Sequence, residues 1–341
     1  MASVGKIEQV RPKHALPGGE VEIAVVGFRP AADDRISCFT NGISTRITAS
    51  SSSRLLVVLP ECDDSSAIVQ IENGENESNG YVITLGKSLA DDMHIVANPA
   101  IDPSDDALIL TRSGSRGQQL PNTLFRLETD GFLDELPVEI LNPTGIAFSP
   151  SGAMYVTNRS DGTVSRIERG EEAVPAASGL GIATGLAFDS NGMMFVGDRS
   201  GTIYRVAEFG DPEKFASIEP SVAAYHIAFG PDGRLYASSP GFASHDLVYA
   251  IDEHGKVETF VRGLGRPQGL AFDREGNLYI AACFRGRHGI VRVDAETRAI
   301  EHFVSGNNVV GLCFTRSGEM IVATSDSVYS LNLGIYGTLL G

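Results

Sequence analysis

Residues 269–281 read Gly-Leu-Ala-Phe-Asp-Arg-Glu-Gly-Asn-Leu-Tyr-Ile-Ala, and this stretch decides the fold. Its first part, an apolar strand that ends in phenylalanine before a glycine-containing turn, recurs along the chain. The aligned phenylalanines stand at positions 148, 188, 229, 272 and 314, with gaps of 40, 41, 43 and 42 residues. A degenerate copy, residues 97–106, precedes them. A period of about 42 residues indicates an array of stacked structural repeats.

Each copy continues with strands of its own. A second strand follows every turn, as in Met154–Thr157 and Leu278–Ala281, and a third comes after it, as in Val164–Ile167. Three or four strands in each repeat predict a β-propeller, because one blade alone leaves both of its faces uncovered. We expect Phe148 and its counterparts to lie between blades.

The number of copies predicts the number of blades. Six copies of the innermost strand indicate a six-bladed propeller, and the last copy ends near Val328–Leu333 without an outer strand. We expect the strand at about 93–96, Met93–Val96, to supply that outer strand and close the ring.

The first 87 residues have a different pattern. Short alternating stretches such as Glu20–Val26 and Arg54–Leu59 are separated by turns such as Pro17-Gly18-Gly19. This pattern predicts an antiparallel β-sandwich, so the whole chain is expected to be all-β. The expected division is 1–87 for the sandwich, 88–92 for a linker and 93–341 for the propeller.

Both parts resemble known families. Pro12, Pro17–Gly19 and the strand from Val21 to Phe28 resemble the opening of an immunoglobulin-like IPT/TIG domain. The motif at 269–281 resembles NHL-repeat propellers and the senescence-marker/gluconolactonase (TolB-like) superfamily. The first resemblance implies a spacer or a module that binds a protein partner, and the second implies a six-bladed fold with a ligand at the mouth of the channel.

Composition restricts the function. The 27 basic and 43 acidic residues give a net charge of −16, which disfavours binding to nucleic acid or to an anionic membrane. The four cysteines form no CxxC pair, which indicates free thiols, although Cys38–Cys62 and Cys283–Cys313 remain open as disulfides. No signal peptide is visible, which favours the cytoplasm, whereas a trimmed N-terminus would leave export open.

The gluconolactonase resemblance implies a divalent cation, held by carboxylate and amide oxygens where the innermost strands begin. The corresponding slots contain no carboxylate: they hold Ala97, Thr144, Thr184, Tyr225, Gln268 and Val310. Asn158 and Asp198 are the remaining candidates for a shifted site that would take Ca²⁺, Mg²⁺ or Zn²⁺. Capping of turns is the alternative for both residues. No cofactor is therefore expected unless the protein is an enzyme.

Repeated arginines form a second candidate site. Arg112, Arg159 and Arg199 each precede a serine at the end of a second strand, and Arg285 stands near the same place in a later repeat. Guanidinium groups that lean into the channel mouth would bind a carboxylate or a phosphate. Pairing with carboxylates such as Asp161 or Asp198 between blades is the alternative.

Tyr225 and His226 complete the expected pocket. They begin the innermost strand of the fourth copy and are the weak candidates for catalytic residues. Two functions therefore stay open. One is a binding or scaffolding propeller with a small anionic or sugar-derived ligand at Arg112, Asn158, Arg159, Asp198, Arg199, Tyr225, His226, Gln268 and Arg285. The other is a divergent gluconolactonase-like hydrolase or lyase that acts on a lactone-like substrate.

Overall fold

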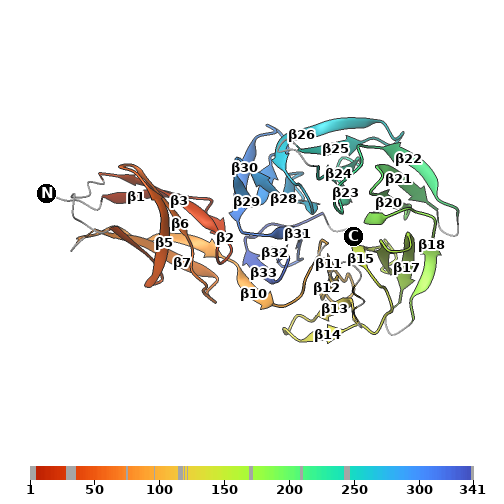
Figure 1. The fold of residues 1–341 in the computed structure, drawn as a ribbon, viewed down its shortest axis with the longest axis horizontal. Coiled ribbons are helices and arrows are strands. Elements are labelled where there is room, and N and C mark those ends of the chain that lie inside the picture. The colour runs from red at the N-terminus through yellow and green to blue at the C-terminus, as the bar shows by residue number, and fades with distance from the viewer. Residues whose placement is uncertain are drawn as a thin grey trace.

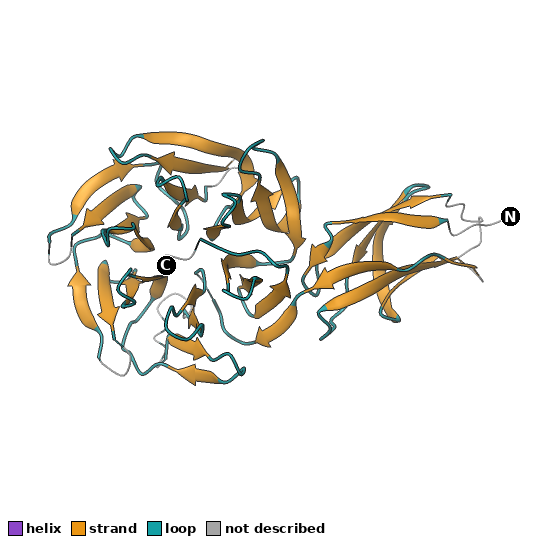
Figure 2. Cartoon of the chain, turned by 180° about the vertical axis from the view of Figure 1, so that it is seen from behind, coloured by secondary structure: helices purple, strands orange, loops and turns teal. Residues whose placement is uncertain are grey.

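The structure is a computed structural model that describes residues 5–27, 36–73, 76–95, 97–113, 118, 120, 122–168, 172–207, 210–241 and 246–338. These residues form strands, loops and turns without any helix, so the fold is all-β (Figure 2). It follows that no described helix could cross a membrane. Figure 1 shows an elongated N-terminal part beside a ring of blades, which confirms the propeller arrangement.

The N-terminal part consists of two layers of strands around one core. One layer has the order β1 (Lys6–Arg11), β3 (Glu20–Val26), β6 (Arg54–Val58), β5 (Ile43–Ser50). The other contains β4 (Ile36–Thr40), β7 (Ser66–Asn73), β8 (Asn76–Glu77) and β9 (Tyr81–Leu85). Alternate residues of β3, namely Val21, Ile23 and Val25, are buried in the core as their spacing predicts.

The ring is built from antiparallel four-stranded sheets, and four of them are separate sheets. Their strands, in sheet order, are β11 (Ala100–Ile101), β12 (Leu108–Thr111), β13 (Leu124–Leu127), β14 (Leu133–Glu135); β15 (Pro143–Phe148), β16 (Met154–Asn158), β17 (Thr163–Ile167), β18 (Val174–Ala177); β19 (Ala183–Phe188), β20 (Met194–Asp198), β21 (Thr202–Val206), β22 (Glu213–Ser217); and β10 (Lys87–Ala90), β33 (Val328–Asn332), β32 (Glu319–Thr324), β31 (Val309–Phe314).

Two further groups of strands pair in the same up-and-down order. They are β23 (Ile227–Phe229), β24 (Leu235–Ser239), β25 (Asp246–Ile251), β26 (Val257–Gly265), and β27 (Leu270–Phe272), β28 (Leu278–Phe284), β29 (Arg287–Val293), β30 (Ile300–Ser305). Pairing of β26 with β28 joins the two groups into one larger sheet.

Repeated aromatic contacts hold neighbouring blades together. The phenylalanine that ends an innermost strand meets an aromatic ring on the second strand of the preceding blade, edge to face. The ring centroids are 4.9 Å apart for Tyr155–Phe188, 5.2 Å for Phe195–Phe229, 4.7 Å for Tyr236–Phe272 and 5.2 Å for Tyr279–Phe314. The expected position of these phenylalanines between blades is confirmed, and each pair adds to the apolar area that stacking buries.

The strand that closes the ring lies earlier than expected. Lys87–Ala90 (β10) pairs antiparallel with β33, whereas the sequence favoured residues 93–96 for this position and placed 88–92 in a linker. Met93 and Ile95 are instead 2% exposed in the core of the neighbouring blade, and Val96 lies outside the described residues. The alternation of apolar residues at Met93 and Ile95 therefore indicated burial correctly, but it did not indicate strand pairing.

A short strand joins the N-terminal part to the ring. β2 (His14–Ala15) pairs in parallel with β9 on one side and with β30, the outer strand of a blade, on the other. The Oγ atom of Ser305 donates to the carbonyl of Glu20 at 2.7 Å, and the N–H of Leu16 donates to the carbonyl of Ser305 at 2.7 Å. One continuous sheet therefore runs from the N-terminal strands into the ring.

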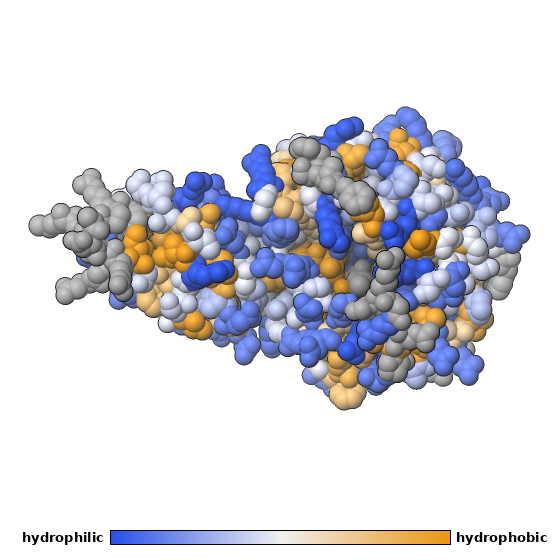
Figure 3. All heavy atoms as spheres, in the orientation of Figure 1, coloured by the Kyte–Doolittle hydropathy of each residue, from blue (hydrophilic) through white to orange (hydrophobic). Residues whose placement is uncertain are grey.

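The surface is mostly polar. On the face seen in Figure 3, hydrophilic residues cover most of the ring, and a larger apolar area lies over the N-terminal strands. All four cysteines are free thiols, so neither of the two conceivable disulfides forms.

Candidate functional site

The two ends of the propeller channel have different chemistry. Innermost strands such as β15 start beside the end of the second strand, where Pro143 pairs with Asn158, and finish at the opposite end, where Phe148 pairs with Met154. We call the first end the entry face and the second the turn face. The sequence placed its candidate ligand site at the entry face.

Arg159 and Arg199 come together at the entry face from neighbouring blades. Both side chains are half-buried. Burial lowers the pKa of Arg159 below its usual value, and the charge of Arg199 lowers it further. The two cations are therefore close enough to repel each other.

Neither arginine has a carboxylate partner among the described residues. Arg199 donates from Nη2 to the carbonyl of Val222 at 2.9 Å, and its Nε is buried without a partner. Arg159 makes one long contact, from Nη2 to Asn142 Oδ1 at 3.5 Å. The structural Arg126 differs, because three carboxylates surround it: those of Asp102, Asp105 and Glu128.

Exposed apolar side chains stand beside the arginine pair. The backbone N–H of Arg159 donates to the carbonyl of Asn142, and the preceding residue, Leu141, is 44% exposed. The backbone N–H of Arg199 donates to the carbonyl of Ile182, which is itself 43% exposed. A ligand on the two guanidinium groups would therefore also meet apolar surface.

Tyr225 contacts the turn that carries Arg199. Its side chain is 0% exposed, and its hydroxyl donates to the carbonyl of Asp198 at 3.1 Å, next to Arg199. Burial raises the pKa of Tyr225. Tyr225 is therefore a buried positioning residue for the turn that carries Arg199, and it does not reach the surface.

His226 occupies a place that other blades give to glycine. Gly145, Gly185, Gly269 and Gly311 stand at this position, and a Cβ at any of them would lie within 3.0 Å of the next innermost strand or of the chain that leads into it. His226 is 4% exposed, its Nε2 has no partner, and burial lowers its pKa to about 4. The ring is therefore neutral near pH 7 and inaccessible to solvent.

Asn158 and Asp198 are committed to turns. Asn158 accepts from the N–H of Ser160 at 3.0 Å and donates to Asp161 Oδ2 at 3.0 Å. Asp198 accepts from the N–H of Ile182 at 2.8 Å and from the hydroxyl of Ser200. Within the described residues no group of three or more potential ligands could hold a metal ion. The donor set at this face therefore does not fit the divalent cation that the gluconolactonase resemblance implied.

The remaining predicted residues are spread out. The guanidinium of Arg112 lies 5.9 Å from the ring of Phe125 on its own blade. Gln268 is half-buried, with its backbone N–H bonded to Ala281. Arg285 stands at the tip of the β28–β29 hairpin and lines a cleft against the N-terminal strands. Of these residues, only Arg159 and Arg199 interact electrostatically, and Tyr225 bonds the turn that carries Arg199.

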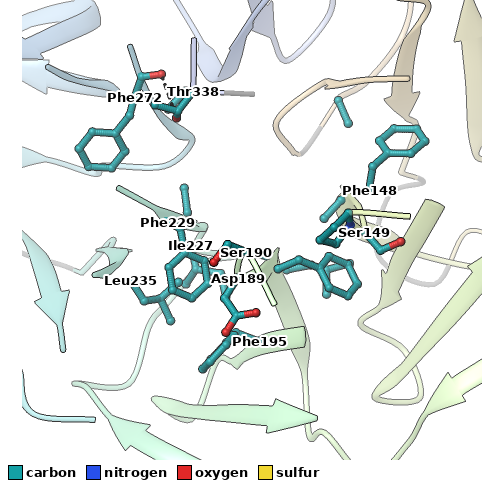
Figure 4. A pocket seen from close by; sticks show the side chains of 18 of the residues that line it. Phe148, Ser149, Asp189, Ser190, Phe195, Ile227, Phe229, Leu235, Phe272 and Thr338 are labelled. Atoms are coloured by element: carbon teal, nitrogen blue, oxygen red, sulfur yellow. Dashed lines mark hydrogen bonds between the residues drawn. The ribbon is translucent and has the colours of Figure 1, made fainter. Parts of the chain in front are cut away.

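The turn face holds a large cavity that the sequence did not indicate. Its volume is about 1170 Å³, and apolar side chains of several blades line it, including Phe148, Ile227, Phe229 and Phe272. Figure 4 shows these side chains around the central space, with Asp189 and Ser190 between them. The aligned phenylalanines were the available signal, but each was assigned to packing between blades alone.

Two further residues shape this cavity. Asn98 contacts the innermost strands of two other blades, donating to the carbonyl of Leu270 and accepting from the N–H of Leu312, both at 3.1 Å. Thr338 lies beside Phe272 in Figure 4 and donates its N–H to the Phe272 carbonyl at 3.0 Å. The chain segment near Thr338 therefore forms part of the cavity wall.

Solved structures resemble this chain in fold. No protein-family model and no curated protein sequence matches it. An auxiliary nutrient binding protein from Bacteroides ovatus matches with a TM-score of 0.55 at 13% identity, over 95% of this chain and 97% of that chain. A candidate gluconolactonase matches at 0.60 and 16% identity, over 74% of this chain and 93% of that chain. Virginiamycin B lyase from Staphylococcus aureus matches at 0.54 and 17% identity, over 89% and 98%. These likenesses, all below 25% identity, support the β-propeller fold.

Proposed function

We propose that this protein is a ligand-binding propeller whose entry face holds a small organic anion between Arg159 and Arg199. One observation carries the proposal: two half-buried guanidinium groups lie close together without a carboxylate partner in the described part of the chain. Like charges in this position repel, and an anion between them turns the repulsion into two charge-assisted hydrogen bonds.

The surroundings favour an anion with an apolar body. Leu141 and Ile182 expose apolar surface beside the two cations. A ligand with a carboxylate, phosphate or sulfate on an apolar or sugar-like frame would use both features. The nutrient-binding name of two structural neighbours agrees with small-molecule binding.

We further propose a number of blades for the ring and a fold family for the N-terminal part. If β23–β26 and β27–β30 are counted as separate blades, six blades surround the channel. Residues 1 to about 86 would then form an immunoglobulin-like sandwich of the IPT/TIG kind, and the propeller would begin with β10. The order of strands in the two N-terminal layers supports this division.

A hydrolase or lyase receives less support than ligand binding. Asn158 and Asp198 use their oxygens in turns, and Tyr225 and His226 are too buried to touch a substrate from the surface. We therefore assign no catalytic step to the entry face.

Titration calorimetry with phenyl phosphate and with inorganic phosphate tests the proposal. The unmodified chain should bind phenyl phosphate more tightly than phosphate, and the double variant Arg159→Met/Arg199→Met should lose at least tenfold in affinity. Arg205→Met is the matched control, because Arg205 is exposed and paired with Glu213 at 2.9 Å. Equal affinity in the double variant and the unmodified chain would contradict a ligand at this place.

A further inference from the structure

A second cleft lies between the N-terminal part and the ring. Its volume is about 760 Å³. One wall comes from the N-terminal residues Gln9–His14 with Glu22, Arg54 and Tyr81. The other comes from Phe284, Arg285, Arg287 and Ile300–Phe303. The parallel pairing of β2 with β30 fixes the two walls relative to each other. Clefts between domains are frequent places for ligands.

The cleft has an excess of positive charge. Its lining contains five cationic side chains, from Arg11, Lys13, Arg54, Arg285 and Arg287, and two carboxylates. This concentration stands out on a chain whose net charge is −16.

Both carboxylates already have partners. Glu22 Oε2 is 2.9 Å from Arg287 and 3.6 Å from Arg54, and Glu301 bonds Arg292 at 3.0 Å. Arg11, Lys13 and Arg285 therefore have no carboxylate partner in the described part of the chain, and they are free to face an anion.

The backbone presents Arg285 in an unusual way. Arg285 and Gly286 form the two-residue turn between β28 and β29, with φ angles of 52° and 80°. Turns with two positive φ angles favour asparagine or glycine, and an arginine there is strained. Its guanidinium lies 4.9 Å from the ring centroid of Phe284. The turn therefore places the Arg285 guanidinium at the edge of the cleft, although asparagine or glycine would fit this backbone conformation better.

Two histidines supply a second, independent observation. His14 and His302 both line the cleft, and the Nδ1 atom of each is buried without a hydrogen-bond partner. The rings of Phe284, Phe303 and Tyr81 add apolar surface. The cleft lining therefore contains hydrogen-bonding capacity that no described protein group uses.

We propose that this cleft binds a small polyanion, a molecule with two or more phosphate, sulfate or carboxylate groups, between Arg11 and Lys13 on one wall and Arg285 on the other. Such a ligand would bridge the N-terminal part and the ring, and it would give the N-terminal strands a direct role in recognition.

Calorimetry with pyrophosphate and citrate tests the cleft in the background of Arg159→Met/Arg199→Met. This background removes the proposed site at the entry face, so the failure of one site can be told from the failure of the other. Pyrophosphate should bind this background protein, and the further changes Lys13→Met and Arg285→Asn should lower its affinity at least tenfold. Asparagine tolerates the positive φ of the turn, so the hairpin is expected to fold.

Arg298→Asn is the matched control. Arg298 also has a positive φ, of 60°, and stacks at 4.4 Å on Phe260, but it does not line the cleft. Its replacement should leave pyrophosphate affinity unchanged. Lys13→Met alone, at an exposed side chain, keeps the test valid if the hairpin variant fails to fold.

Two results would overturn the proposal. The first is unchanged pyrophosphate affinity after Lys13→Met and Arg285→Asn. The second is binding of polyglutamate with no binding of pyrophosphate or citrate, which would point to an acidic protein segment as the ligand.

Discussion

Arg159 and Arg199 stand on neighbouring blades, and the charge of Arg199 lowers the pKa of Arg159, which burial has already depressed. None of the described acidic side chains pairs with either arginine, although the sequence contains 43 acidic residues. At Arg126 it places three carboxylates around one guanidinium. Arg126 therefore has a structural role, whereas Arg159 and Arg199 have the proposed binding role.

Replacing one member of the pair should stabilise the protein without ligand. Arg159→Met removes a like-charge repulsion of the order of 1 kcal/mol, which predicts a rise of about 1–3 °C in unfolding temperature. Differential scanning fluorimetry at low ionic strength measures this rise, and about 1 M salt should reduce it. Arg205→Met breaks an ion pair instead and should give no rise. A lower unfolding temperature for Arg159→Met would show that the arginines do not repel each other.

Acid should destabilise the protein through its buried histidines. His226 and His14 have a pKa of about 4 in the folded chain, against 6.5 in the unfolded chain, and burial also lowers the pKa of His302. Between these two values the unfolded chain binds more protons than the folded chain. The contribution of these histidines to the free energy of unfolding is therefore complete above pH 6.5 and falls as the pH drops toward 4.

Urea unfolding across this pH window measures the effect. His226→Gln should make the fall in unfolding free energy shallower, whereas His254→Gln should leave it unchanged because the His254 side chain is 81% exposed. Identical pH profiles for His226→Gln and the unmodified chain would remove His226 as a contributor.

The aromatic pairs between blades predict unequal costs for two equivalent phenylalanines. Phe272 is 5% exposed and packs on Tyr236, so Phe272→Ala should cost about 3–5 kcal/mol. Phe148 is half-buried at the cavity and makes no ring contact with a described residue, so Phe148→Ala should cost about half as much. Denaturant midpoints compare the two variants, and equal costs would refute the difference in packing.

Closure of the ring should depend on β10. Ser88 pairs with Tyr329, and proline at position 88 would disturb the ladder at a cost of about 1–3 kcal/mol. Ser88→Pro should lower the unfolding temperature and make the chain near Val328 sensitive to protease, whereas Ser88→Thr should have little effect. Unchanged protease resistance in Ser88→Pro would mean that β10 is dispensable for closure.

The cavity at the turn face should be open to small solutes. The chain has no tryptophan, so Phe229→Trp and Phe188→Trp each introduce a single fluorescent reporter. Phe229 is half-buried and Phe188 is 3% exposed, so acrylamide should quench the first reporter more strongly. Equal quenching would show that the two positions have the same access.

The repeat explains why much of the fold could be predicted. Each copy contains its own strands, turn and phenylalanine within about 42 residues, so local periodicity is enough to indicate the blades and the contacts between them. The alternation of Val21, Ile23 and Val25 likewise indicated the buried face of β3. Such patterns depend only on near neighbours in the chain.

The candidate site could be predicted only in part. The spacing of Arg159 and Arg199 brought both to the entry face, but the same reasoning placed Arg285 with them. The β28–β29 hairpin extends further, to Phe284 and Arg287, and carries Arg285 into the cleft with the N-terminal strands. Asn158 and Asp198 had the right chemistry for a metal, yet nearby backbone N–H groups bind their oxygens.

The sequence by itself determined the repeat, the class of fold and the contacts of the phenylalanines, because these arise from residues close together in the chain. Tertiary structure alone decided that Lys87–Ala90 closes the ring and that Arg285 lines a cleft with the N-terminal strands. It also decided that Arg159 and Arg199 lie near enough for their charges to interact, with no carboxylate partner for either among the described residues. These relationships join segments that are far apart in sequence. The length of the β28–β29 hairpin determines the place of Arg285, and pairing with β33 determines the place of β10; neither leaves a periodic signal in the sequence.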